Sequence, residues 1–312
     1  MNLTKKISLL LAVLVVVGGG GIFINSILGK PSNPEVIVKS ALSNAFTETT
    51  KHTETTAKLT TSAGEADFTL AGDVSNAEKL LPTADYQLEV SGSLPLENTA
   101  AKVSGSLNFR VVGGDIYFEV LNPILSGSSE KVTALQTYLS GIAGKWLSLP
   151  LQKLSEENTE VSKIITAKNE AQQNLRVKLQ TIFSNNTAFE VKKASGNFLT
   201  GKYYITVIPK LGEFLTDDMV NNLGKLLGFT TAEETTQLKA QLTAMQPEIT
   251  LTISRSGNEF LGYATTLQTG ETILTIENTV KKLSENPSIT PPETSEVFDA
   301  ESYEAAFGDV NP

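Results

Sequence analysis

Apolar and polar residues alternate along much of the first half of the chain. The clearest stretch runs from Lys102 to Val111, where the odd-numbered positions are apolar or glycine and the even-numbered positions are polar. This period of two is typical of a strand with one buried and one solvated face. Gly113-Gly114 follows and favours a tight turn into a second alternating stretch, Asp115–Leu121. With similar stretches around Phe68 and Leu88, the pattern predicts an antiparallel meander.

Helical spacing of apolar residues interrupts the strands in several places. Asn33-Pro34 supplies a side-chain cap followed by a proline suited to the first turn, which predicts that a helix begins there. Apolar residues three or four positions apart predict helices within 123–143, 151–184 and 214–227. Thr231 with Glu234 has the spacing of a capping box and predicts one more helix.

Further strands lie between and after these helices. A short strand around Trp146 ends at a proline, which cannot donate a hydrogen bond to a sheet. Trp146 is the single tryptophan, and it lies either at the mouth of a pocket or buried in its strand with its N–H bonded. Strands return at 188–193 and 201–209, which we expect to join across Gly196, and three more lie between 248 and 278.

Strands with one apolar face, together with helices grouped in two places, predict an α+β fold. We expect one curved antiparallel sheet, a half-barrel, with the helices packed on its concave apolar face. This domain spans residues 31–283, and a tail, 284–312, follows it. The tail has four prolines, seven carboxylates and no basic residue, so we expect it to be disordered. Its aromatic residues either stay solvated or dock on the body or a partner; they are Phe298, Tyr303 and Phe307.

The first thirty residues form a separate segment. Lys5 and Lys6 precede an uncharged run of 22 residues from Ile7 to Leu28. As a helix this run is about 33 Å long, enough to cross a hydrocarbon core of about 30 Å. The positive charges before it predict a single-pass anchor with a cytoplasmic N-terminus and an extracytoplasmic body. The alternative is a secretory signal cleaved near Gly18–Gly21, and both interpretations export the body.

The composition narrows the chemistry and the partners. Cysteine is absent and histidine occurs once, at His52, which excludes disulfides and the catalytic and metal sites built from several of these residues. The net charge is −9, and three of the 25 basic residues lie in the first thirty positions, where no acid occurs. The rest of the chain is therefore strongly acidic. It is predicted to repel the phosphates of nucleic acids and of anionic lipid headgroups.

Catalytic patterns are nearly absent. Ser128–Lys131 fits an S-x-x-K pattern, but the S-D-N and K-T-G elements that accompany it in penicillin-interacting enzymes do not occur. The acidic pairs Asp217/Asp218 and Glu233/Glu234 stand near helix starts, where negative charge interacts favourably with the helix dipole. The chain is therefore predicted not to be an enzyme and to use no cofactor or metal. A glycosidase built from distant carboxylates is the remaining enzymatic alternative.

The order of these elements resembles a group of bacterial envelope proteins. The local match is Asp115-Ile116-Tyr117-Phe118, followed after the helical excursion by Gly144-Lys145-Trp146-Leu147-Ser148-Leu149. Over residues 34–280 the chain is similar in this way to the LolA-like lipoprotein carriers and the LppX/LprG-like glycolipid carriers, which are half-barrels. Members of the LppX/LprG type are anchored through a lipid-modified cysteine, which this chain lacks. A chain held by a protein anchor receives or presents lipid without diffusing away with it.

The resemblance implies a cavity between sheet and helices that holds lipid or lipoprotein acyl chains, with each buried CH₂ contributing about 0.8 kcal/mol. The strand residues expected to line it are Phe68, Leu70, Leu88, Leu107, Phe109, Phe118, Ile205 and Val207. The residues expected to form a helical lid are Phe214, Leu215, Met219, Leu223 and Leu227. Ordinary core packing is the alternative for each of them, because periodicity does not distinguish a filled core from a hollow one. The leading hypothesis is membrane-tethered, extracytoplasmic lipid binding, and the alternative is a non-enzymatic scaffold with a solid core.

Overall fold

The structure is a computed structural model of the whole chain. It describes residues 33–45, 50–62, 64–76, 79, 81–96, 99–183, 189–197, 199–210, 216–226, 231, 233–234, 236–237, 239–240 and 247–299. The predicted anchor, residues 1–30, and the tail residues Tyr303 and Phe307 lie outside these ranges. Within the described ranges, no helix combines the length and the apolar character needed to cross a membrane.

The described residues form five helices and twelve strands. The first half of the chain contains α2 (Pro34–Ala45), β1 (Lys51–Thr61), β2 (Gly64–Ser75), β3 (Thr83–Leu96), β4 (Thr99–Val112), β5 (Asp115–Ser126), α3 (Glu130–Ile142) and β6 (Trp146–Leu149). The second half contains α4 (Leu151–Glu157), α5 (Thr159–Phe183), β7 (Phe189–Asn197), β8 (Lys202–Pro209), α7 (Asp217–Leu226), β9 (Ile249–Ser254), β10 (Phe260–Thr269), β11 (Thr272–Lys282) and β12 (Glu296–Val297).

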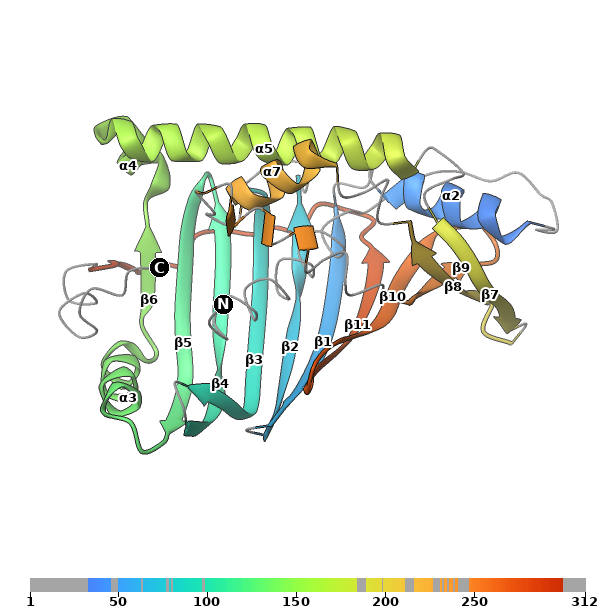
Figure 1. Cartoon of the computed structure of the whole chain (residues 1–312). Coiled ribbons are helices and arrows are strands. Elements are labelled where there is room, and N and C mark those ends of the chain that lie inside the picture. The colour runs from blue at the N-terminus through green and yellow to red at the C-terminus, as the bar shows by residue number, and fades with distance from the viewer. Residues whose placement is uncertain are drawn as a thin grey trace.

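All twelve strands belong to one open, curved sheet (Figure 1). Their order is β12-β6-β5-β4-β3-β2-β1-β11-β10-β9-β8-β7. Two antiparallel meanders, β1 to β6 and β7 to β11, join where β1 pairs with β11 and Lys51 lies opposite Lys282. The pair β12–β6 is parallel, and every other neighbouring pair is antiparallel. The expectation of an α+β fold with a single curved antiparallel sheet is therefore confirmed.

The predicted local signals form the expected structures. Residues of β4 and β3 pair so that Phe109 lies opposite Tyr86 and Leu107 opposite Leu88, which places the apolar positions on one face. Gly113 and Gly114 have φ angles of 64° and 92°, the left-handed conformation that a two-residue hairpin turn requires. The helix α2 begins at Pro34, and the Asn33 side-chain oxygen accepts a hydrogen bond from the Glu35 backbone N–H at 3.0 Å.

Two local predictions differ from the structure. The helical stretch predicted over 151–184 is divided at Asn158, whose side-chain oxygen accepts hydrogen bonds from the backbone N–H groups of Glu160 and Val161 and caps α5. The turn between β7 and β8 was predicted at Gly196, which instead lies inside β7. The chain turns further on, at Gly201, which has a positive φ of 64°.

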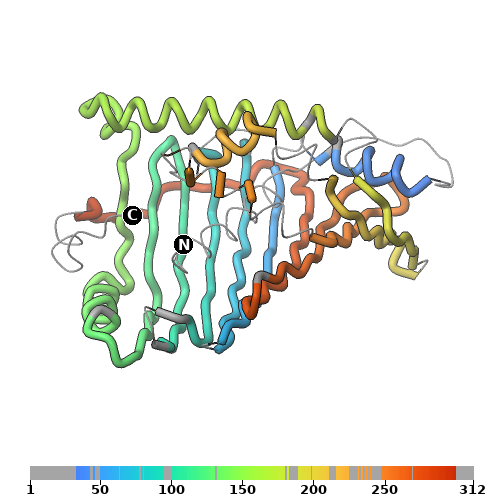
Figure 2. The backbone as a smooth tube through the Cα atoms, in the orientation of Figure 1, coloured from blue at the N-terminus to red at the C-terminus, as the bar shows by residue number. Residues whose placement is uncertain are grey.

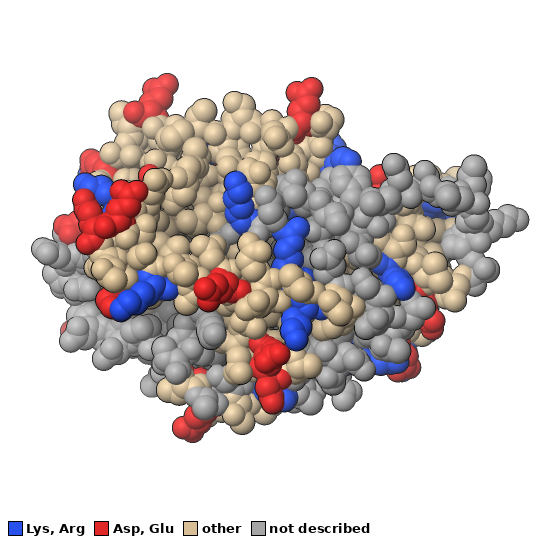
Figure 3. Space-filling model, turned by 90° about the horizontal axis from the view of Figure 1, so that it is seen from above, with Lys and Arg blue, Asp and Glu red and all other residues tan. Residues whose placement is uncertain are grey.

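The helices cover the ends and one side of the sheet (Figure 2). The long helix α5 lies across one end of the central strands, and Gln172 donates a hydrogen bond to the Lys79 carbonyl in the β2–β3 connection. Its buried side is a stripe formed by Ala171, Leu175 and Leu179. The helix α7 packs on α5, and α3 lies near the opposite end of the sheet (Figure 1). Seen from the α5 side, acidic and basic side chains are interspersed (Figure 3).

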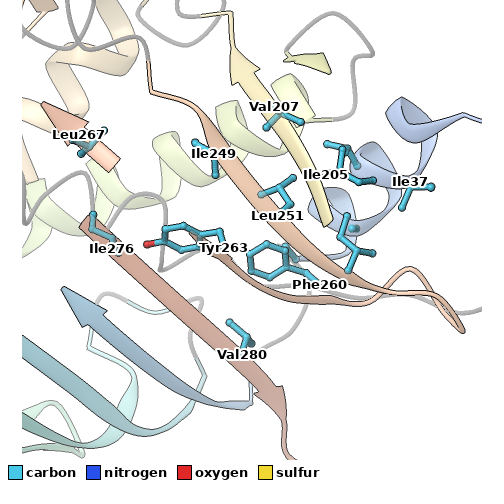
Figure 4. Packing of buried hydrophobic residues seen from close by; sticks show 14 of the residues in the cluster. Ile37, Ile205, Val207, Ile249, Leu251, Phe260, Tyr263, Leu267, Ile276 and Val280 are labelled. Atoms are coloured by element: carbon cyan, nitrogen blue, oxygen red, sulfur yellow. The ribbon is translucent and has the colours of Figure 1, made fainter. Parts of the chain in front are cut away.

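The largest cluster of buried apolar residues lies under α2. It joins α2 to the apolar face of β1 and of β8 to β11, and many of its members are shown in Figure 4. Ile253, Ile276 and Val207 are at most 1 % exposed, so this part of the molecule is tightly packed.

The segment after β11 returns to the other edge of the sheet. Its strand β12 adds next to β6, where the Phe298 backbone N–H donates to the Ser148 carbonyl at 2.9 Å. The Phe298 ring lies 5.7 Å from the Phe118 ring, between centroids. This contact supports the docking alternative weighed for Phe298, while the mobility of the tail as a whole stays a prediction.

Candidate functional site

The apolar face of β2 to β5 carries a row of side chains that are not fully buried. Leu70 lies opposite Leu88, Leu88 opposite Leu107, and Leu107 opposite Val120. Leu70 is 37 % exposed, and the others are partly buried. We call this surface the central strip, and it consists of Leu70, Leu88, Val90, Leu107, Phe118 and Val120.

Buried clusters surround the central strip. At the α5 end, Val74, Ala84 and Val111 are at most 4 % exposed. At the α3 end, the cluster consists of Ala101, Leu125 and Val132. On the side towards β1 and β11, the α2 cluster begins. This face of the sheet is therefore closely packed around the central strip, as protein interiors are, whereas the strip itself is left partly open.

Charged side chains lie on the other face of the same strands. Two ion pairs and one hydrogen bond there join neighbouring strands. The ion pairs are Lys58–Glu65 at 2.6 Å and Arg110–Asp85 at 3.0 Å, and the hydrogen bond joins His52 Nδ1 and Asp73 Oδ1 at 2.7 Å. Trp146 is also on this outer face, because it pairs with Glu119 and stacks under the Arg110 guanidinium at 4.9 Å. It is partly exposed, so neither position weighed for it from the sequence describes it.

The structure brings six of the predicted lining residues onto one surface. These are Phe68, Leu70, Leu88, Leu107, Phe109 and Phe118, all partly buried or exposed. Ile205 and Val207 share the same sheet face, but they are 1 % and 0 % exposed inside the α2 cluster.

The predicted lid is described in part. Met219 and Leu223 are buried on α7, which an ion pair between Lys178 and Asp218 joins to α5 at 3.3 Å. Three further lid residues, Phe214, Leu215 and Leu227, lie outside the described residues. Asp217, which precedes Asp218 in the predicted acidic pair, accepts a hydrogen bond from Lys239 at 2.6 Å, and this contact lowers the pKa of Asp217.

Two polar residues that sequence reasoning missed lie on this same face. Tyr263 and Asn278 pair directly across β10 and β11, and they are 2 % and 3 % exposed. The Tyr263 hydroxyl and the Asn278 side-chain oxygen have no hydrogen-bond partner. Burial raises the pKa of Tyr263, so its hydroxyl stays protonated. The sequence could have indicated Asn278, because it lies in the same alternating series as the apolar residues Leu274, Ile276 and Val280.

Other features of the described surface suggest no chemistry. An open depression of about 610 Å³ lies beside α3 and contains none of the predicted lining; its walls are Glu130, Thr133, Ala134, Thr137 and Tyr138. Among the described residues, no group of three or more His, Asp or Glu side chains has the arrangement of a metal site.

Comparisons with known proteins leave the family open. No protein-family model matches the chain, and no curated protein matches it. Among solved structures, the chain is similar to LprF from Mycobacterium bovis, with 10 % sequence identity. The alignment covers 84 % of this chain and 97 % of LprF, and the TM-score is 0.37. This likeness is distant, and the function proposed below rests on the site alone.

Proposed function

We propose that this chain binds an apolar ligand, namely lipid or lipoprotein acyl chains, against the central strip. The observation that carries the proposal is the incomplete burial of large apolar side chains that lie in a row between packed clusters. Exposed apolar surface of this kind costs free energy in water and is typical of binding sites.

The dimensions and chemistry of the central strip suit hydrocarbon. It crosses β2 to β5, three strand spacings of about 4.8 Å each, or about 14 Å. No member of the strip carries a polar side-chain group. Ten buried methylenes would contribute about 8 kcal/mol, an upper value because one side of the strip is open.

A matched pair of double variants tests this proposal. Leu70→Gln with Leu88→Gln places two amides on the strip, whereas Thr69→Gln with Glu89→Gln changes the adjacent cross-strand pair on the outer face. The full chain of each variant is purified, extracted with organic solvent and analysed for lipid by mass spectrometry. We expect the wild type and the outer-face variant to carry lipid and the strip variant to lose most of it.

Two results would contradict the proposal. Equal amounts of lipid in both double variants would show that the strip is not the site. A wild-type chain that arrives empty and cannot be loaded with a fluorescent fatty acid would favour the alternative, a scaffold with no ligand.

The membrane attachment belongs to the same proposal. Residues Ile7–Leu28 tether the body outside the membrane, because an uncharged run of this length follows Lys5 and Lys6. Membrane fractionation of the full chain, with an intact mass measurement, tests it. We expect the uncleaved chain in the membrane fraction, and a mature chain that begins after Gly21 would show instead that the segment is a signal peptide.

A further inference from the structure

Tyr263 and Asn278 continue a row of residues that crosses the sheet and includes the central strip. Asn278 lies opposite Thr55, Thr55 opposite Leu70, and Leu70 opposite Leu88. The row therefore changes from apolar side chains to polar ones where the open strip meets the packed α2 cluster. Figure 4 shows the hydroxyl of Tyr263 at the end of the ring that is turned away from Phe260.

The orientation of the Asn278 amide is set by its neighbours. Its Nδ2 donates to the Thr55 hydroxyl oxygen at 2.8 Å and to the Glu54 carbonyl oxygen at 3.4 Å. The Glu54 carbonyl oxygen can only accept a hydrogen bond, so the amide atom that faces it on β1 must be the nitrogen, and Oδ1 points away from it. Oδ1 is then an acceptor and the Tyr263 hydroxyl a donor, both buried and both without a partner.

Leaving two such groups unpaired in a closed interior is costly, and native structures rarely do so. An uncharged alcohol matches the bonding needs of both atoms, because a hydroxyl can accept a hydrogen bond from Tyr263 and donate one to Asn278. A carboxylate fits poorly, since it would bring a second acceptor towards Oδ1 and bury a negative charge. An ester without a free hydroxyl would leave Oδ1 unpaired.

We infer that Tyr263 and Asn278 bind the free hydroxyl of an uncharged acyl lipid whose hydrocarbon chain lies along the central strip. The inference rests on the proposed function and names the class of lipid, a partial acylglycerol. From Asn278 to Val120 the row crosses five strand spacings, about 24 Å, which is the scale of a long extended acyl chain.

The test compares three probes that share one acyl chain. Delipidated full chain, held in amphipol, is titrated with 1-monooleoylglycerol, methyl oleate and oleate, and the bound lipid is measured after gel filtration. The variant Tyr263→Phe removes the donor and keeps the ring. The control Tyr204→Phe makes the same change on β8, two strands away from β10, on the outer face, where Tyr204 lies opposite Thr252.

We expect the wild type to bind 1-monooleoylglycerol about tenfold more tightly than methyl oleate, the ratio that one lost hydrogen bond of about 1.4 kcal/mol produces. Tyr263→Phe should weaken binding of 1-monooleoylglycerol by a similar factor, while Tyr204→Phe should leave the affinity for each probe unchanged.

Three results overturn the inference alone and leave the proposed function standing. They are equal affinity of the wild type for 1-monooleoylglycerol and methyl oleate, tighter binding of oleate than of 1-monooleoylglycerol, and an unchanged affinity in Tyr263→Phe. A water molecule that satisfies both atoms would produce the last of these. Absence of binding for all three probes would overturn the inference and the proposed function together.

Discussion

Replacing Tyr263 with phenylalanine should stabilise the ligand-free protein, although the change removes an atom from a buried site. The side chain is 2 % exposed and its hydroxyl has no hydrogen-bond partner. An unpaired buried hydroxyl costs about 1–3 kcal/mol, because it gives up its bonds to water and gains none. The small void left by one oxygen offsets part of this gain, so we expect a net stabilisation of about 1–2 kcal/mol. For a domain of this size each kcal/mol shifts the melting temperature by about 2–4 °C, so we expect a rise of about 2–8 °C.

Tyr86→Phe provides the control with the opposite sign. Tyr86 is partly buried, and its hydroxyl is hydrogen-bonded to the Thr53 side chain. Removing it leaves Thr53 unpaired and should cost about 1 kcal/mol. Thermal unfolding of delipidated protein, followed by circular dichroism, measures both variants. If Tyr263→Phe lowered the melting temperature as Tyr86→Phe is expected to do, the Tyr263 hydroxyl would have a partner in the empty protein. The reasoning about a polar end to the site would then be refuted.

Three further predictions concern the surroundings of the site. Gly262 has a φ of +143°, and a Cβ there would clash with a β11 carbonyl oxygen, so Gly262→Ala should destabilise the fold by about 3 kcal/mol or more. Gly270 lies in an open turn, so Gly270→Ala should cost only about 1 kcal/mol. Equal losses of stability for the two variants in denaturant titrations would contradict this prediction. Burial raises the pKa of Tyr263, so the unfolded chain loses this proton at a lower pH than the folded chain; the free energy of unfolding is independent of this ionisation below about pH 10 and falls as the pH rises further, and in alkaline unfolding experiments it should fall less steeply for Tyr263→Phe than for the wild type. Phe298→Ala removes the ring that contacts Phe118 and should speed proteolysis after residue 283, and an unchanged cleavage pattern would show that β12 holds this segment without the ring.

The elements that the sequence predicted well are those with local causes. The alternation from Lys102 to Val111 identifies both the strand β4 and its apolar face, because side chains along a strand point to opposite sides in turn. Gly113-Gly114 predicts its hairpin since both residues tolerate positive φ angles. The start of α2 follows from the Asn33 cap and from Pro34. In each case a few neighbouring residues determine the geometry.

Features that depend on contacts between distant segments were not predictable in this way. The pairing of β1 with β11 joins residues more than 200 positions apart, and the sequence of neither strand indicates which strand it pairs with. The break at Asn158 was hidden because the apolar spacing continues through it. The strand β12 lies in a segment whose composition resembles a solvated tail, and its position depends on the Phe118 ring and the β6 edge.

The distinction between a filled and an open core is the clearest case of information that periodicity lacks. Ile205 and Leu107 occupy the same phase on the same sheet face, and their sequence patterns are alike. Ile205 is 1 % exposed because α2 packs above its strand, whereas Leu107 is only partly buried between the clusters. The difference arises from which helix crosses which strands. Asn278 shows the same limit for a polar residue. An amide at a position that otherwise alternates as apolar indicates that it needs a hydrogen-bond partner, but only the folded chain shows where it lies relative to the central strip.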